Sequence, residues 1–376
     1  MKIKSFEFSL KELAGSMGDF GTLFPLAVGY IYVCGLDPSG FLIMMGLANI
    51  VTALVYRLPI PIEPMKVMAV MAIAQKWTPS MIYASGFGMG IVWLFLAATG
   101  AVSWIARMTP LSVIRGIQAG LGVLLAIEAI KLFSGGPALG VISIVIVLTL
   151  RENRYAPAAA VLMLLGVAVM YAKGDLHRIP SPAFTLPPIT TFTVREIWDT
   201  MLLAGFAQIP LTITNATIAT ASLIATYWPE RPPMTERLSW TQGIMNTVFP
   251  FFGGMPMCHG AGGLAGQYYY GARTGGANMM EGSIEISLGL FLSASIAGFF
   301  SAFPPAIIGA MMFMVGIELT RFAKDVRLGR DIVPLGVTII LSVSTNMAWG
   351  FLAGIVSHHL MLKIFRKRNP PNPHKE

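Results

Sequence analysis

The chain has 376 residues, of which 55% are hydrophobic and only 12% are charged, and its mean hydropathy is +0.69. Soluble domains carry about 25% charged residues, so this composition excludes a soluble protein and indicates an integral membrane protein. The net charge of +8 does not indicate nucleic-acid binding, because the lysines and arginines cluster in loops and near the C-terminus.

Fourteen hydrophobic segments of helical length follow one another and predict an all-α polytopic membrane protein. Their expected limits are 14–33, 40–56, 63–75, 81–106, 111–133, 138–150, 156–172, 196–224, 239–251, 258–271, 281–302, 305–321, 331–345 and 348–365. Segments three and ten are shorter than the roughly 20 apolar residues that cross a bilayer, so we expect them to be broken.

The long polar stretch 173–195 separates the first seven segments from the last seven. We therefore expect a first repeat over 1–172, an inter-repeat loop over 173–195 and a second repeat over 196–365. Residues 366–376 are expected to form a short cytoplasmic tail.

The distribution of positive charge predicts the orientation of the chain. With both termini in the cytoplasm, the predicted outer side receives only Lys76, Lys131, Lys173, Arg178 and Arg195. Residues 1–13 are charged and do not read as a signal peptide. We therefore expect cytoplasmic termini and a multi-pass protein of the plasma or inner membrane.

Two proline motifs recur in the two halves. Phe24-Pro25-Leu26 of segment one matches Ile209-Pro210-Leu211 of segment eight, and Glu63-Pro64-Met65-Lys66 of segment three matches Met255-Pro256-Met257-Cys258-His259 of segment ten. Because each half contains an odd number of spans, the second half enters the membrane in the opposite sense. The pattern predicts an inverted repeat, which is a recurrent transporter architecture.

The prolines of 57–66 hold the backbone extended, because each fixes φ and lacks an N–H donor. Extended backbone is tolerated at membrane depth only where protein covers it or where it lines a water-filled cavity. Pro64 is placed to begin the helix that follows, and Lys66 adds a cation to its electropositive N-terminus. We therefore expect two half-helices, in segments three and ten, whose N-termini face one another and bind an anion.

These motifs resemble the molybdate-transporter family that is related to the sulfate permeases. The resemblance covers nearly the whole chain and is most specific at 18–22, 61–66, 208–212 with Asn215, and 256–260 continuing to 271–276. It implies the seven-plus-seven fold shared with uracil permeases, in which a core domain (segments one to four and eight to eleven) moves against a gate domain (five to seven and twelve to fourteen). The soluble C-terminal regulatory domain usual in sulfate permeases is not expected here.

The predicted substrate-binding residues lie on the broken and proline-containing segments: Thr22, Pro64, Met65, Lys66, Gln208, Asn215, Met257, Cys258, His259 and Gly260. A lysine at mid-membrane costs roughly 2.5–3.5 kcal/mol, so Lys66 indicates an anion site unless it snorkels or only pairs with Glu63.

Thr22 and Gln208 precede Pro25 and Pro210, where we expect helices one and eight to break. These two side chains either donate to an oxyanion or bond between helices, whereas a structural role is the stronger expectation for Asn215.

Asp19, Glu63 and His259 are candidates to carry a coupled proton, because a carboxylate that becomes protonated would offset the charge of an incoming anion. Alternatively, Asp19 caps a helix and Glu63 only neutralises Lys66. Cys258 and His259 have no second ligand pair at metal spacing, and no hydrolase motif accompanies Glu63. We therefore expect no metal, no cofactor and no enzymatic activity.

The leading hypothesis is a secondary transporter of a tetrahedral oxyanion, above all molybdate, with sulfate or tungstate as alternatives and a proton as the candidate symported ion. A nucleobase permease of the same fold typically places glutamates in segments eight and ten, where this chain has Gln208 and no acid. A channel would show uptake that does not saturate, and a non-transporting membrane scaffold has no need of an intramembrane Lys66. The coupling ion, the direction and the oligomeric state, a homodimer included, stay open.

Overall fold

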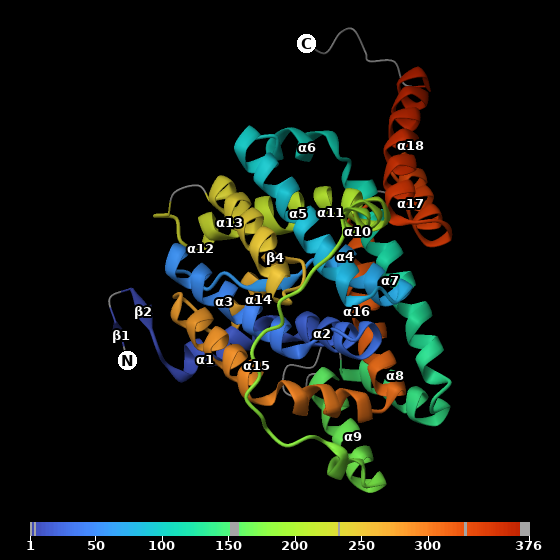
Figure 1. Ribbon diagram of the computed structural model, residues 1–376. Helices are drawn as coiled ribbons and strands as arrows, with labels where there is room; N and C mark the ends of the chain where they lie inside the picture. Colours follow the sequence, from blue (N-terminus) through green and yellow to red (C-terminus); the bar gives the residue numbers. More distant parts are fainter. Residues whose placement is uncertain (1, 4, 151–157, 232–233, 327–328, 369–376) are drawn as a thin grey trace.

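The computed structural model describes residues 2–3, 5–150, 158–231, 234–326 and 329–368, and the side chains of residues 2, 3, 19, 21, 22 and 365–368 lie outside this description. The described chain is almost entirely helical (Figure 1). Two small antiparallel pairs of strands interrupt the helices, β1 (Lys2–Ile3) with β2 (Phe6–Glu7) and β3 (Ile62–Pro64) with β4 (Met257–His259).

Each predicted segment of the first half contains at least one helix. The helices are α1 (Leu10–Ser16), α2 (Phe20–Cys34), α3 (Pro38–Tyr56), α4 (Lys66–Gln75), α5 (Pro79–Thr99), α6 (Val102–Met108), α7 (Leu111–Phe133), α8 (Pro137–Leu150) and α9 (Ala158–Lys173). Short 3-10 turns η1 (Met17–Asp19) and η2 (Asp175–Arg178) precede α2 and follow α9. Segment four is divided at Gly100, which has a φ of 67° and ends α5.

The second half follows the same pattern. Its helices are α10 (Val194–Thr200), α11 (Phe206–Thr212), α12 (Ala219–Tyr227), α13 (Thr235–Val248), α14 (Ala261–Tyr270), α15 (Gly276–Ala302), α16 (Pro305–Arg321), α17 (Ile332–Ser344) and α18 (Met347–Arg368). The 3-10 turns η5 (Phe249–Phe252) and η6 (Phe322–Asp325) follow α13 and α16.

The expected breaks of helices one and eight at Pro25 and Pro210 are wrong. Pro25 lies inside α2 and Pro210 inside α11. The whole stretch Val194–Tyr227 runs as one helix of 34 residues, with π-helical turns η3 (Met201–Gly205) and η4 (Ile213–Ile218) on either side of α11. Such wider turns let a helix pass a proline without ending.

The helices have the length and the surface of a membrane protein. Seven of the described helices are long and apolar enough to cross a membrane, and shorter apolar helices have 10–17 residues. Large apolar side chains project from the outer helices, with exposed fractions of 64% for Phe95, 70% for Leu164 and 58% for Val356. A surface of this kind is stable against lipid rather than water, so the chain is an all-helical, multi-pass membrane protein.

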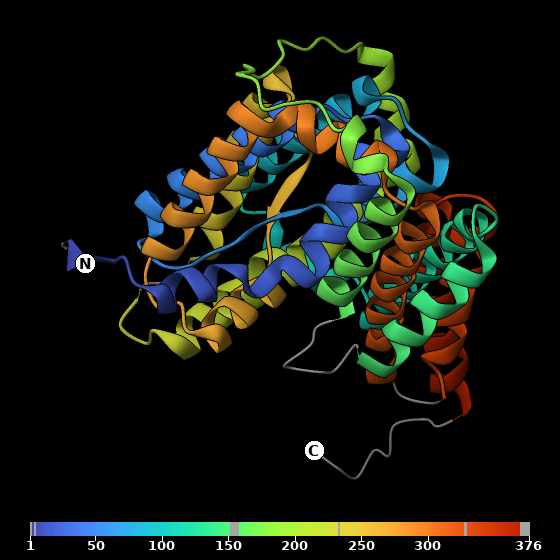
Figure 2. The same cartoon turned by 90° about the horizontal axis from the view of Figure 1, so that it is seen from below.

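The long helices pack in pairs that form two groups. Helix α3 packs along α15 and α5 along α13, whereas α7 packs along α16 and α17 along α18. Both views show α3, α13, α14 and α15 on one side of the molecule and α7, α16, α17 and α18 on the other (Figures 1 and 2).

Helix α4 lies in the core, and the side chains from Val67 to Ile73 are each at most 1% exposed. This burial explains why its sequence has no polar face. Strand β4, the orange arrow in Figure 2, likewise lies in the middle of the helices.

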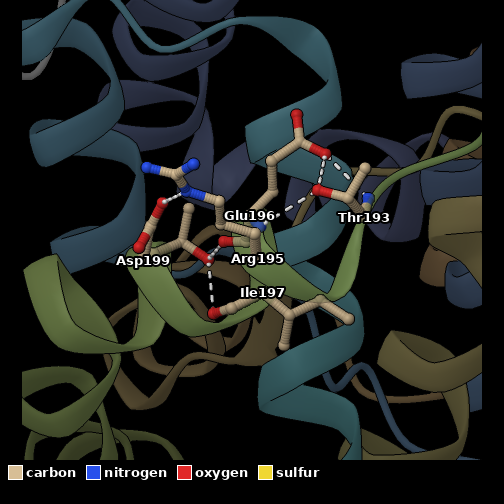
Figure 3. A network of polar contacts seen from close by, with 6 residues as sticks. Thr193, Arg195, Glu196, Ile197 and Asp199 are labelled. Atoms are coloured by element: carbon tan, nitrogen blue, oxygen red, sulfur yellow. Dashed lines mark hydrogen bonds and ion pairs between the residues drawn. The ribbon is translucent and has the colours of Figure 1, made fainter.

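A capping box begins the long helix α10–α12 (Figure 3). The Thr193 hydroxyl accepts a hydrogen bond from the Glu196 backbone N–H at 3.2 Å, and the Glu196 carboxylate accepts one from the Thr193 N–H at 2.7 Å. Arg195 and Asp199 form an ion pair at 3.6 Å on the same turn. The reciprocal bonds satisfy N–H groups at the helix start and fix where this helix enters the bundle.

Candidate functional site

The two broken segments meet through their main chains. Strands β3 and β4 pair antiparallel, with Ile62 opposite His259 and Pro64 opposite Met257. The pairing satisfies backbone groups that would otherwise be unpaired at membrane depth. The broken segments three and ten that the sequence predicts are therefore present, and they lie side by side.

Each strand leads directly into a half-helix. Helix α4 begins at Lys66 and α14 at Ala261, and neither N-cap residue, Met65 or Gly260, supplies a side-chain cap. The first turn of each helix therefore presents backbone N–H groups and the positive end of the helix dipole to its surroundings.

Gln208 caps α4 from a distant part of the chain. Its Oε1 accepts hydrogen bonds from the N–H groups of Val67 at 2.7 Å and Met68 at 3.3 Å, and its Nε2 donates to Thr212 Oγ1 at 2.5 Å. In this conformation the amide bonds between helices, which is the second of the two roles that the sequence left open. The N-terminus of α14, which follows Gly260, is the less covered of the two.

Helix α13 supports β4 with two polar side chains. Asn246 accepts from the Met257 N–H at 2.8 Å and donates to the Met257 carbonyl at 2.6 Å. The Gln242 Oε1 accepts from the His259 N–H at 3.1 Å. These amides are fully buried, so they hold the strand in one position.

A cavity of about 240 Å³ lies against the two half-helices. The residues that line it are Glu63, Lys66, Arg115, Gln118, Gln208, Leu211, Thr212, Asn215, Ala216, Ala219, Cys258, His259, Gly260, Ala261, Gly262 and Phe322. The predicted residues Lys66, Gln208, Asn215, Cys258, His259 and Gly260 are therefore brought together, along with Glu63. Pro64, Met65 and Met257 are buried in or beside the strands behind this lining.

Lys66 and Glu63 form an ion pair inside the site. Lys66 Nζ lies 3.0 Å from Glu63 Oε2, and the side chains are 27% and 2% exposed. Lys66 thus neutralises the buried Glu63 carboxylate and also faces the cavity. The sequence offered pairing with Glu63 and an anion site as alternatives for Lys66, and the structure allows both at once.

His259 ends a hydrogen-bonded chain. Its Nε2 lies 2.8 Å from Thr241 Oγ1, which lies 2.7 Å from the Tyr56 hydroxyl. The imidazole is fully buried, and the Tyr56 ring meets it edge-on at 5.8 Å. This chain connects β4 to the C-terminal end of α3.

Two predicted residues have no described side chain. Asp19 lies in η1 and Thr22 in α2, but the positions of their side chains are outside the described part of the structure.

Sequence reasoning missed a second cation at the cavity. Arg115 Nη2 lies 2.7 Å from Asp325 Oδ2, and its Nη1 donates to Gln118 Oε1 at 2.9 Å. The guanidinium also lies over the Phe322 ring, 5.1 Å from its centroid. Arg115 falls within predicted segment five, so the rule that flagged Lys66, an ionisable residue within a span, also applied to it.

The donor set of this cavity suits a small anion. Two cations, three side-chain amides, the Thr212 hydroxyl and the N-termini of α4 and α14 border this one cavity. Such donors bind oxygen atoms that carry negative charge.

Comparisons with known proteins give a consistent result. A family model described as "Molybdate transporter of MFS superfamily" matches residues 11–125 and 200–319. Molybdate transporter 1 of Arabidopsis thaliana is 31% identical over 93% of this chain and 87% of the relative. Molybdate transporter 2 of the same plant is 32% identical over 94% of this chain and 87% of the relative.

Solved structures with much lower identity share the fold. The transmembrane domain of the cyanobacterial bicarbonate transporter BicA superposes with a TM-score of 0.67 at 17% identity, covering 93% of this chain and 97% of that one. The murine anion transporter Slc26a9, in an inward-facing state, gives a TM-score of 0.72 at 12% identity, covering 97% and 70%.

Proposed function

The chain belongs to the molybdate transporter family, and from that membership we propose that it is a secondary active transporter that moves molybdate by alternating access. The observation that carries the mechanism is the cavity at the paired N-termini of α4 and α14. Molybdate is a tetrahedral dianion, and its oxygens would accept from the first-turn N–H groups of α14 and from Lys66. Sulfate and tungstate have the same shape and charge and are the alternatives.

The proposed architecture is an inverted repeat of seven and seven segments, over 1–172 and 196–365 with the loop 173–195 between them and the tail 366–376 after them. In this repeat α3 corresponds to α13, α5 to α15, α7 to α16 and β3 to β4. Exchanging each element for its counterpart therefore converts the packed pair α3–α15 into the packed pair α13–α5, and leaves the pairs α7–α16 and β3–β4 unchanged. This symmetry of contacts supports the repeat.

The proposed core domain contains segments one to four and eight to eleven, and the gate domain contains the others. The cavity lies between them, because Lys66 and Gln208 belong to the core while Arg115 and Phe322 belong to the gate. Movement of the core against the gate would carry a bound anion from one side of the membrane to the other.

The proposed orientation places both termini in the cytoplasm of a plasma or inner membrane. Lys76 and Lys131, both expected outside, border one cavity of about 480 Å³ together with Glu128. Their shared position supports a common outer face.

We further propose that transport is coupled to a proton carried by Glu63 or His259, with Asp19 as the third candidate. Glu63 lines the cavity proposed to bind the anion, and His259 has a hydrogen-bonded route through Thr241. Uptake that is equal at acidic and neutral pH, without proton flux, would argue against all three.

Radiolabelled molybdate uptake into proteoliposomes tests the function, with excess sulfate or uracil as competitor and at two pH values. We expect molybdate uptake that saturates, that excess sulfate inhibits little and that uracil does not inhibit. Equal competition by sulfate would make the protein a general oxyanion transporter, and inhibition by uracil would favour a nucleobase permease. Uptake that rises linearly with concentration would indicate a channel.

A further inference from the structure

The charges bordering the cavity match a dianion only when Arg115 is included. Lys66 is paired with Glu63 at 3.0 Å, so these two residues together add no net charge. The N-termini of α4 and α14 each contribute roughly half a positive charge, or about one together. A tetrahedral dianion carries two negative charges, so one further positive charge at the site would complete the match.

Arg115 borders the same cavity, and one of its N–H donors makes no hydrogen bond among the described residues. Its Nη2 pairs with Asp325 and its Nη1 donates to Gln118. Among the described residues, its Nε is buried and has no hydrogen-bond partner. The planar guanidinium presents its donors as a fork that matches two oxygens of a tetrahedral oxyanion.

The two ion pairs at the cavity differ in how readily an anion would break them. The Asp325 side chain is 57% exposed, so water solvates this carboxylate once Arg115 leaves it. The Glu63 side chain is 2% exposed, and separating Lys66 from it would leave a buried charge unpaired. An arriving anion therefore displaces Asp325 more easily than Glu63.

We propose that Arg115 is a substrate-binding residue that exchanges Asp325 for the oxyanion when the anion occupies the cavity. The proposal deepens the proposed function and rests on it. Arg115 belongs to the proposed gate and Lys66 to the core, so an anion held between them bridges both domains. Movement of the core then removes the anion from Arg115, which returns to Asp325.

The test compares molybdate uptake by Arg115→Gln, Arg115→Lys and Asp325→Asn with the wild type in proteoliposomes. We expect Arg115→Gln to raise KM about tenfold or more, with a smaller change in the maximal rate, and Arg115→Lys to lie between. Asp325→Asn removes the competing carboxylate, so its KM should stay equal to or fall below that of the wild type. The matched control is Arg195→Gln, which removes an exposed arginine from its pair with Asp199 and should leave KM unchanged (Figure 3).

Equal damage from Arg115→Gln and Asp325→Asn would overturn the proposal, because the ion pair would then serve only to hold the two helices together. An unchanged KM in Arg115→Gln would overturn it as well. If Arg115→Gln does not fold, a raised KM in Arg115→Lys together with a normal or lowered KM in Asp325→Asn supports the proposal, and any other combination rejects it. If the wild type transports sulfate and no molybdate, the substrate assignment fails, while the same KM comparison with sulfate still decides the role of Arg115.

Discussion

Lys66 and Glu63 determine the electrostatics of the cavity as a pair. Their side chains lie 3.0 Å apart, and Glu63 is almost completely buried. Removing one member of a buried pair leaves an unpaired charge, which is strongly destabilising. Any variant of Lys66 therefore changes both the anion site and the environment of Glu63, and the two effects have to be separated.

Replacing Lys66 with Met should raise the KM for molybdate about tenfold or more, because the cation beside the anion is lost. The double variant Glu63→Gln with Lys66→Met separates the two effects, since it removes both charges. We expect the double variant to recover protein stability but not KM. Recovery of a wild-type KM would show that Lys66 only neutralises Glu63.

Local sequence signals identified seven of the sixteen residues that line the cavity. Lys66, Cys258, His259 and Gly260 follow from the proline motifs and the repeat. The capping role of Gln208 could not be predicted, because its bond to the Val67 N–H joins residues that are 141 apart in sequence. Arg115 carries the same signal as Lys66, an ionisable residue within a predicted segment, but was not among the predicted site residues.

At the level of elements, the site depends on the close approach of β4 and β3. Gly260 follows β4 and lies against the Glu63 carboxylate, and a Cβ at this position would overlap that carboxylate. At Gly336, in α17, a Cβ would meet nothing within 4 Å. Gly336→Ala is therefore a matched control for Gly260→Ala, because the same substitution meets open space at one position and a carboxylate at the other.

Gly260→Ala should push the Glu63 carboxylate away from Lys66, destabilise the protein by about 1–3 kcal/mol and weaken molybdate uptake. Gly336→Ala should leave uptake unchanged and stabilise α17 by about 0.5–1 kcal/mol, because alanine favours a helix. Thermal unfolding in detergent and uptake assays measure both effects. Wild-type behaviour of Gly260→Ala would contradict the close packing.

The turn between α14 and α15 depends on one acceptor from the N-terminal helix α1. The Glu12 Oε1 accepts from the N–H groups of Arg273 at 3.0 Å and Thr274 at 3.1 Å. Burial raises the pKa of the Glu12 carboxyl, and these two backbone donors oppose the rise. A pKa above the unfolded value means that stability from this group is lost as pH rises through the folded pKa.

Glu12→Gln keeps an acceptor oxygen but does not ionise, whereas Glu12→Ala leaves both N–H groups without it. We expect Glu12→Ala to cost about 1–3 kcal/mol at acidic pH and less as the pH rises. The melting temperature of Glu12→Gln relative to the wild type should increase from pH 4 to pH 8. A constant difference would show that Glu12 has the same pKa in both states.

Proline motifs predicted the broken segments three and ten but also breaks at Pro25 and Pro210, which are wrong. At segments three and ten, β3 and β4 pair with each other, and the pairing provides hydrogen-bond partners for their backbone groups. In the stretch around Pro210, π-helical turns let the helix continue. Whether a proline ends a helix depends on the partners its surroundings provide, and those partners are not visible in the sequence.

At the scale of the whole molecule, the hydrophobic segments predicted the order of the helices along the chain, while the pairing of α3 with α15 and of α5 with α13 came only from the structure. Hydrophobic runs show which stretches are helical but not which helix each one contacts. Apolar faces in a membrane are nearly interchangeable by composition, and shape decides their packing.

Cysteine labelling should show the proposed orientation. Lys131 and Arg330 have side chains that are 63% and 55% exposed and fall on opposite predicted sides. A membrane-impermeant maleimide should label Lys131→Cys on intact cells and Arg330→Cys only after permeabilisation. The wild type, whose Cys34 and Cys258 are both buried, is the unlabelled control. The opposite pattern would reverse the orientation.

The pairing of β3 with β4 has a consequence for how this protein tolerates mutation. Peptide groups hold the two half-helices together, and a change of side chain does not remove a peptide group. Saturation mutagenesis should therefore score positions 65 and 257 as tolerant of apolar residues of similar volume, although their backbone supports the site. A binding site built in this way can keep its geometry while its sequence diverges.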